Sequence, residues 1–343
     1  MRLGVVAIGS VFWLAATCAS APADPVEDFY RGRNVTMVIG YSVAGGYDNY
    51  ARVVARHLGN HIPGNPTILP QNMPGAGSLR SANWLFNAAP KDGSVIGMFS
   101  RGMAMEPLIG TSQTQFDAQK FSWLGSGTNE VSTCVIWHES PVKTWADALK
   151  TPFTVGGEGS GSDPDIFATV VRNVFGVKLR LVSGYPGSAE VALAIERREV
   201  DGRCGWSYSS LRLQRPDWIT KKQVNILVQL ALSKTPELPD VPLITDFATT
   251  DRQRQILRLV FSRQAMARPF AAPPGIPPER KAALRKAFDE TMKDPAFLDE
   301  AKQRGLEVNP VSGAEIEALI GELYRTSPDV VAEVRASIAP GAK

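Results

Sequence analysis

Two adjacent glycines near the start of the chain, Gly45 and Gly46, lie in a loop whose residue types suit the binding of an anion. The apolar, β-branched run at 35–40 predicts a buried strand before the loop, and apolar residues at helical spacing predict a helix after it. Glycines leave backbone N–H groups uncovered, and a helix N-terminus adds unpaired N–H groups and the positive end of its dipole. We expect Asp48 at the helix N-cap. The alternative is a plain β–α turn that binds nothing.

The same loop chemistry recurs further along the chain. Glycine and hydroxyl residues fill 72–78, after one predicted strand, and 156–164, after another, while a third strand ends at Arg101. Strands that alternate with helices predict a parallel sheet, in which ligands bind at the carboxyl ends of the strands. Because the pattern begins again at about 153, we predict two similar α/β lobes whose loops face each other. Residues 279–304 and 314–335 are predicted to form long amphipathic helices.

Charged and aromatic side chains beside these loops have two interpretations each. Arg101 could form two parallel hydrogen bonds to a second carboxylate of a ligand, or it could be a surface arginine. Asp48, Asp163 and Asp201 border tight turns, where fixing the loop is expected more than contact with a ligand. Three tyrosines could line a cleft or simply pack against its wall: Tyr41, Tyr47 and Tyr185.

No constellation of catalytic groups stands beside the loops in the sequence. Residues 205–209 come nearest to a nucleophile elbow but lack its final glycine, and there is no Walker loop or dinucleotide fingerprint. His57 and His61 have a spacing that would suit a metal on one helical face, yet Gly59 and Pro63 predict that the helix ends between them. We therefore expect no catalysis, no metal and no cofactor.

Length and composition predict an exported protein of two domains. The chain has 343 residues, 44% hydrophobic and 21% charged, with a net charge of +3 and no basic stripe that would suit nucleic acid. Residues 1–23 carry the features of a signal peptide cleaved near Ala23, which predicts a periplasmic location; a lipoprotein anchored at Cys18 is the alternative. Cys134 and Cys204 could pair in an oxidising compartment or remain buried free thiols.

Runs of residues along the whole mature chain resemble the Bug-type solute-binding proteins, the extracytoplasmic receptors of tripartite tricarboxylate transporters. The most specific pairing is Y-S-V-A-G-G-Y-D at 41–48 with Q-N-M-P-G-A-G at 71–77. The chain departs from the family pattern where Tyr41 and Ser42 replace Pro-Phe and Ala44 replaces a proline. Further runs that carry the resemblance are 89–93, 157–163, 199–201, 238–242 and 272–277.

The resemblance implies a periplasmic-binding-protein fold of type II, with two α/β lobes joined by crossover strands and a ligand cleft between them. Lobe one would comprise 24–128 and 235–343, and lobe two 129–234. The implied function is to capture a small organic carboxylate and deliver it to membrane permease subunits, and we expect a monomer. The residues expected to bind the ligand are Tyr41, Ser42, Ala44, Gly45, Gly46, Asp48, Asn72, Gly75, Ala76, Gly77, Arg101, Ser160, Gly161, Ser162, Asp163, Tyr185 and Asp201.

Two other functions remain open at this point. An exported carboxylate-processing hydrolase would need a nucleophile or a metal, for which Ser160, Ser162 or the pair His57 and His61 are the candidates. A ligand-sensing partner of a membrane sensor would use the same cleft. The sequence does not choose among tricarboxylate, dicarboxylate, aromatic acid and amino acid ligands.

Overall fold

The computed structural model describes residue 1 and residues 24–110, 114–159 and 161–339. Residues 2–23 of the expected signal segment and Ser160 lie outside the described residues. Within them, the first sheet contains β1 (Asn34–Ile39), β2 (Thr67–Asn72), β3 (Val95–Met98), β4 (Ser122–Ser126), β10 (Pro269–Ala272) and β11 (Val311–Ser312). The second sheet contains β5 (Ser132–Trp137), β6 (Phe153–Gly156), β7 (Leu179–Val182), β8 (Gly202–Ser207) and β9 (Val224–Leu230).

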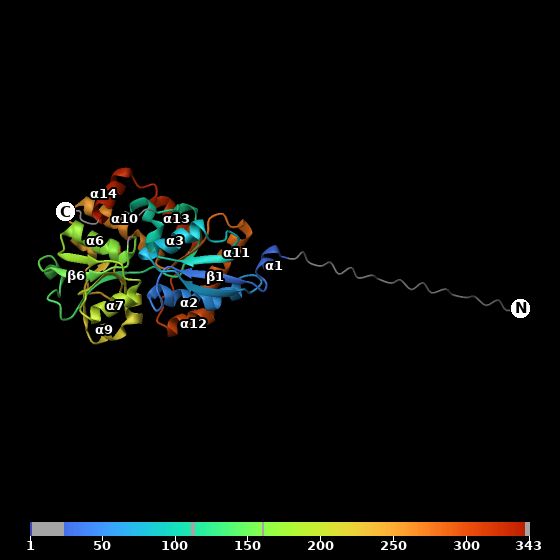
Figure 1. Cartoon of the computed structure of the whole chain (residues 1–343), viewed down its shortest axis with the longest axis horizontal. Helices are drawn as coiled ribbons and strands as arrows, with labels where there is room; N and C mark the ends of the chain where they lie inside the picture. The colour runs from blue at the N-terminus through green and yellow to red at the C-terminus, as the bar shows by residue number, and fades with distance from the viewer. Residues whose placement is uncertain (2–23, 111–113, 160, 340–343) are drawn as a thin grey trace.

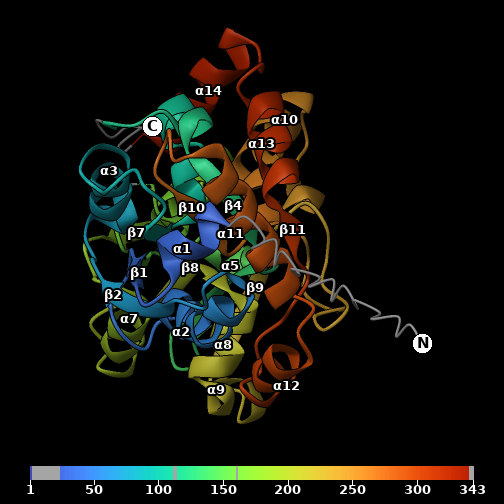
Figure 2. The same cartoon turned by 90° about the vertical axis from the view of Figure 1, so that its right-hand side faces the viewer.

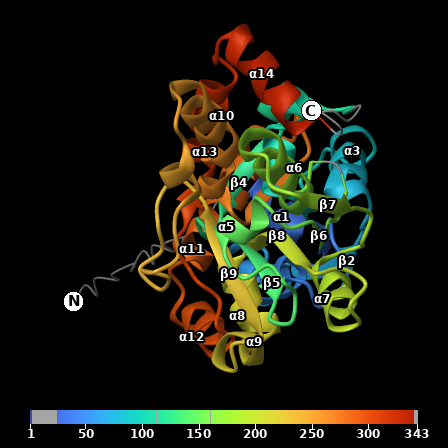
Figure 3. The ribbon, with the colours of Figure 1, turned by 90° about the vertical axis from the view of Figure 1, so that its left-hand side faces the viewer.

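The strand orders are β11-β4-β10-β3-β1-β2 and β7-β6-β8-β5-β9. As predicted, the strands that carry the glycine loops are parallel to their neighbours: β1 pairs with β2 and β3, and β6 with β7 and β8. The strands that connect the lobes are antiparallel, since β10 pairs with β3 and β4, and β5 with β8 and β9. Figure 3 shows the second sheet with β9 and β7 at its two edges.

Helices follow the strands of both sheets in turn. In the first half they are α1 (Pro25–Tyr30), α2 (Gly46–Leu58), α3 (Leu79–Asn87) and α4 (Glu106–Ile109). In the second half they are α5 (Trp145–Ala148), α6 (Asp163–Phe175), α7 (Ser188–Glu196), α8 (Tyr208–Gln214) and α9 (Pro216–Thr220). The remaining helices are α10 (Asp251–Phe261), α11 (Pro278–Thr291), α12 (Pro295–Gln303), α13 (Gly313–Leu323) and α14 (Pro328–Ile338).

The two sheets stand in separate halves of the molecule, as Figure 1 shows with β1 in one half and β6 in the other. This is the two-lobed α/β architecture that the sequence predicts. Helices α11 and α13 contact β4 of the first sheet, and α6 contacts β7 and β8 of the second. Figure 2 views the end of the molecule that carries α1, β1 and β2.

The chain passes twice between the lobes, along two segments that hydrogen-bond to each other. The Gly127 amide donates to the Arg268 carbonyl at 3.1 Å, and the Ala267 amide donates to the Thr128 carbonyl at 2.9 Å. The second passage therefore lies at 264–268. The sequence analysis assigns residues 235–243 to lobe one, but they lie beside β9 of the second sheet. There the side-chain amide of Gln229 donates to the Leu238 and Val241 carbonyls at 2.8 Å each.

The C-terminal helices differ from the prediction in two ways. Each expected long helix is split, because Asp294 caps α12 by accepting from the Ala296 amide at 2.8 Å and Pro328 begins α14. In addition, α14 contacts α6 of the second half, where the Asn173 side chain donates to the Ser337 carbonyl at 2.8 Å. The C-terminal segment thus packs on both halves of the chain.

Cys134 and Cys204 form a disulfide, which decides between the two alternatives left open by the sequence. They lie opposite each other on the adjacent strands β5 and β8 and are buried. Among the helices that the structure describes, none is long and apolar enough to cross a membrane.

Candidate binding site between the lobes

The β1–α2 loop is held in place by buried polar contacts. Gly45, not Asp48, is the N-cap of α2, which corrects the expectation from the sequence. Asp48 lies in the first turn of the helix, where its carboxylate accepts from the Ala44 amide at 2.9 Å and pairs with Arg52 at 2.9 Å. Ala44 has a φ of 67°, and this backbone contact holds it in that left-handed conformation. Asp48 therefore fixes the loop.

Asn72 supports the same loop from the end of β2. Its side-chain amide donates to the Tyr41 carbonyl and to the Asp48 carboxylate at 2.8 Å each, and its oxygen accepts from Arg52 at 2.8 Å. Both ends of the amide are thus used within the first lobe. Asn72 positions the loop in this structure and does not project toward the other lobe.

The glycine loop after β2 reaches the second lobe through its backbone. Gly75, Ala76 and Gly77 all have positive φ values, 141°, 47° and 60°, which turn the chain outward. The Gly77 amide donates to the Glu158 carbonyl at 3.1 Å, and this hydrogen bond joins the two glycine loops. Ser42 also joins the two lobes, through its side chain: its hydroxyl donates to the Glu190 carboxylate of α7 at 2.9 Å.

The β6–α6 loop uses its own carboxylate to satisfy its backbone. Asp165 accepts from the Glu158 and Gly159 amides at 2.7 and 3.1 Å and from the Ser162 hydroxyl at 3.1 Å. These two N–H groups, which precede the predicted binding residues 160–163, already have a partner within the loop. The same hydroxyl of Ser162 donates to the Gly159 carbonyl at 2.7 Å, so this side chain also fixes the loop.

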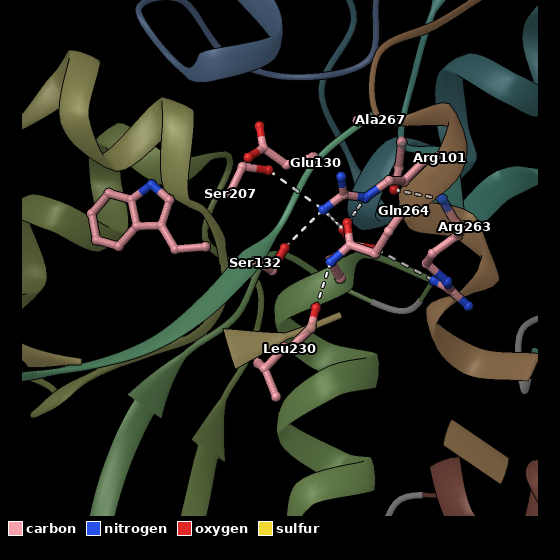
Figure 4. Close-up of polar contacts among 12 residues, drawn as sticks. Arg101, Glu130, Ser132, Ser207, Leu230, Arg263, Gln264 and Ala267 are labelled. Atoms are coloured by element: carbon pink, nitrogen blue, oxygen red, sulfur yellow. Dashed lines mark hydrogen bonds and ion pairs between the residues drawn. The ribbon is translucent and has the colours of Figure 1, made fainter. Parts of the chain in front are cut away.

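Arg101 crosses the boundary between the lobes and is only 1% exposed, so the surface alternative is wrong. Its guanidinium pairs with Asp163 at the start of α6. It also donates to Ser132 at 2.8 Å and to Ser207 at 3.4 Å, as Figure 4 shows. Asp163 also lies 3.5 Å from Arg263. Although burial opposes it, the Asp163 carboxylate raises the pKa of the Arg101 guanidinium.

A second buried ion pair, which the sequence reasoning missed, joins Arg203 of β8 to Glu158 of the β6–α6 loop at 2.7 Å. The two side chains are 5% and 4% exposed. Burial raises the pKa of the Glu158 carboxyl against the opposing effect of Arg203. A charged residue inside a fully buried strand was the signal that could have revealed Arg203, and a glutamate within a glycine loop was the signal for Glu158.

These groups surround a cavity of about 30 Å³ between the lobes. It is lined by four of the predicted binding residues, Tyr41, Gly45, Gly46 and Asp163. Tyr47, which the sequence suggested for a cleft wall, and the unpredicted Arg203 line it as well. The tyrosines Tyr41 and Tyr47 pack with ring centroids 4.7 Å apart.

Three further predicted residues, Asp201, Tyr185 and Gly161, are not part of the lining of this cavity. Asp201 accepts from the Thr154 amide at 2.7 Å and from its hydroxyl at 2.9 Å, so it joins β8 to β6. Tyr185 is half-buried, and its amide donates to the Gly157 carbonyl at 3.0 Å. Gly161, with a φ of 79°, approaches Gly102 of the first lobe closely.

A larger cavity, of about 800 Å³, lies between α10, α13 and the segments 129–131 and 231–236. None of the predicted binding residues lines it. We place the candidate site by its donors, charges and loops, and these converge on the smaller cavity.

The two histidines of the metal alternative contact α12 instead. His57 lies 2.8 Å from Glu300, and His61 lies 2.9 Å from Asp294. Within the described residues, no group of three or more His, Cys, Asp and Glu side chains is arranged to hold a metal ion.

The model of the tripartite tricarboxylate transporter family receptors matches residues 50–335. The chain belongs to this family. Relatives in sequence include the UPF0065 protein in the gbd 5′ region of Cupriavidus necator, 25% identical over 308 residues that cover 87% of this chain and 85% of that protein. A second, from Pseudomonas sp. strain P51, is 24% identical and covers 68% of this chain and 69% of its own length.

Solved structures share the fold of this receptor-family chain. The periplasmic binding protein BugD superposes with a TM-score of 0.72 at 20% identity and covers 90% of this chain and 98% of its own. The protein MatC of Rhodopseudomonas palustris, solved with bound malate, superposes with a TM-score of 0.68 at 17% identity, covering 90% and 99%. The family and these neighbours are solute-binding receptors, not enzymes.

Proposed function

We propose that this protein is a periplasmic receptor that captures a small organic carboxylate between its lobes and delivers it to the membrane subunits of a tripartite tricarboxylate transporter. The observation that carries the proposal is the convergence, around one interlobe cavity, of the Gly45–Gly46 loop at the start of α2 and the loop at the start of α6. Neighbours of the same fold were solved with adipate and with malate.

Capture requires the lobes to move. A cavity of about 30 Å³ has room for little more than a water molecule, so an organic acid can enter only when the lobes separate. The segments at 127–131 and 264–268 are the only described passages between the sheets and would act as the hinge. The ligand would shift the population toward a closed form through contacts made only when both lobes touch it.

The hydrolase alternative finds little support in the geometry. The Ser162 hydroxyl donates to the Gly159 carbonyl and to Asp165. The two candidate histidines, His57 and His61, contact Glu300 and Asp294 instead of this serine. A serine nucleophile needs an available base, and the Asp165 oxygen that accepts from Ser162 already accepts from the Glu158 and Gly159 amides. A receptor that serves a membrane sensor would use the same interlobe site, and a pull-down against the membrane subunits would distinguish it from a transport receptor.

A thermal-shift screen of the mature chain against organic acids and neutral sugars tests the proposal. A ligand at about 100 times its Kd should add about 2.7 kcal/mol to the free energy of unfolding, which is readily seen as a rise in Tm. We expect a rise with carboxylates, and the acid should be recovered unchanged. No rise with any acid, or consumption of the acid, would contradict the proposal.

A further inference from the structure

The interlobe cavity contains an arginine with unused hydrogen-bond donors. The Arg203 side chain is 5% exposed, and its Nη2 atom donates to Glu158 at 2.7 Å. Its Nε and Nη1 atoms find no partner among the described residues. A buried donor without a partner is costly, so such a group at a binding site favours any ligand that supplies an acceptor.

Arg101, the arginine that the sequence suggested for this role, has partners on two of its three nitrogens, and only its Nη1 atom has none among the described residues. It pairs with Asp163 and donates to Ser132 and Ser207, which together use its Nε and Nη2 atoms. It does not line the cavity, whereas Arg203 does. Of Arg101 and Arg203, Arg203 is therefore the one placed to meet a ligand.

The surroundings of Arg203 hold its side chain in position. It extends from β8 next to Cys204, whose disulfide to Cys134 ties β8 to β5. The guanidinium lies over the ring of Trp206, with Cζ 5.2 Å from the ring centroid. A guanidinium fixed by a sheet, an aromatic ring and one carboxylate loses little conformational freedom when it binds.

The opposite wall of the cavity carries backbone donors. Gly45 and Gly46 line it at the start of α2, where the first N–H groups of a helix have no intrahelical partner. An acid captured between these two walls would therefore lie between a helix N-terminus on the first lobe and a guanidinium on the second.

We propose that Arg203 binds a carboxylate of the ligand and thereby determines that the receptor selects an acid over the corresponding amide or alcohol. The inference rests on the proposed function, because it assigns the residue that reads the ligand in the same site. Glu158 is a positioning residue: it holds one side of the guanidinium and leaves the other nitrogens for the ligand.

The test compares the strongest acid of the screen with the same molecule in which one carboxylate is converted to an amide. Removal of Arg203 alone would leave Glu158 buried without a partner, so the informative variant is the double substitution Glu158→Gln with Arg203→Met. Glu158→Gln alone and Arg180→Met, an exposed arginine of β7 in the same lobe, are the matched controls.

We expect calorimetric titration to show that the double variant binds the acid about 10- to 100-fold more weakly than the wild type, the usual loss for a hydrogen bond to a charged group. Binding of the amide should change little, so the preference for acid over amide should disappear. Arg180→Met should leave both affinities unchanged, and circular dichroism should show that all variants are folded.

Two failures are distinguishable. If the wild-type protein binds no acid, the proposed function itself is contradicted. If the wild-type protein prefers the acid and the double variant keeps the same preference, the receptor function stands and the assignment of Arg203 is overturned.

Discussion

Two clusters of arginine–carboxylate pairs in this molecule use the same chemistry in opposite environments. Between the lobes, Arg101 pairs with Asp163, and the side chains are 1% and 8% exposed. On the surface where α2 meets α12, Arg56 pairs with Glu300, and the side chains are 44% and 22% exposed. Both clusters join segments far apart in the chain, but only the first excludes water.

The comparison teaches which pairs define the relation of the lobes. A buried pair must keep both partners, because either one alone is a charge without compensation. An exposed pair can exchange its partner for water and contributes little. The interlobe pairs should therefore control how the lobes fit together, and the α2–α12 pairs should adjust the stability of the first lobe alone.

The largest effect should follow the loss of Asp163. Asp163→Asn retains the size of the side chain but leaves Arg101 and Arg263 without their shared carboxylate. We expect the free energy of unfolding to fall by about 3 kcal/mol, the usual result of breaking a buried ion pair. Urea denaturation followed by circular dichroism measures this change.

A double variant provides the control for that experiment. Asp163→Asn combined with Arg101→Met removes both charges and should recover part of the lost stability. A single variant as stable as the wild type would show that the interlobe pair is hydrated in solution, and the contrast with the surface cluster would fail.

A smaller effect is expected at the surface cluster. The hydrogen bond from Arg56, with further contributions from His57 and Arg304, lowers the pKa of the Glu300 carboxyl from 4.5 to about 2. A carboxyl whose pKa is lower in the folded than in the unfolded protein stabilises the fold at any pH above the unfolded-state pKa. This stabilisation is lost as the pH falls through the folded-state pKa. Glu300→Gln should therefore cost about 1 kcal/mol at neutral pH.

The pH dependence distinguishes this effect from a packing defect. The difference in stability between wild type and Glu300→Gln should shrink as the pH falls from 4.5 toward 2. At neutral pH, about 1 M salt should reduce it as well, because partly exposed charges are screened. A difference that is constant with pH and salt would assign the loss to packing.

The smallest effect should come from an ion pair whose partners are all exposed. Arg31 contacts Glu27 and Asp28 at the end of α1, and its side chain is 60% exposed. Arg31→Ala should leave the urea midpoint unchanged within error, since such pairs contribute little. A clear loss of stability would show that exposure alone does not separate the two classes of pair.

The sequence predicts local features well where one segment decides them. The apolar run before the first glycine loop is β1, and the loop leads into α2 as expected. Pro295 and Pro328 were visible breaks in the C-terminal helices, so their splitting was predictable from residue types.

Features that depend on contacts between distant segments of the chain could not be predicted from the sequence. The burial of Arg101 depends on its partner Asp163, which lies 62 residues further along the chain. No local sequence pattern spans that separation. Cys134 and Cys204 pair because two strands become neighbours in the sheet. Asp48 was misplaced at the N-cap because a carboxylate inside the first turn can bond backward to the loop, as it does to Ala44.

The central claim, that an acid binds where the Gly45–Gly46 loop faces the second lobe, is tested most directly by calorimetric titration of Gly46→Val. A Cβ atom on Gly46 would lie 2.8 Å from Cβ of Ser210 in α8 and closer still to its hydroxyl, so this substitution should keep the lobes from closing. Gly321→Val is the matched control, because a Cβ there meets nothing within 4 Å. We predict that wild type and Gly321→Val bind the acid alike, while Gly46→Val, still folded, binds it at least about 10-fold more weakly. Equal binding by a folded Gly46→Val protein would contradict the placement of the site between the lobes.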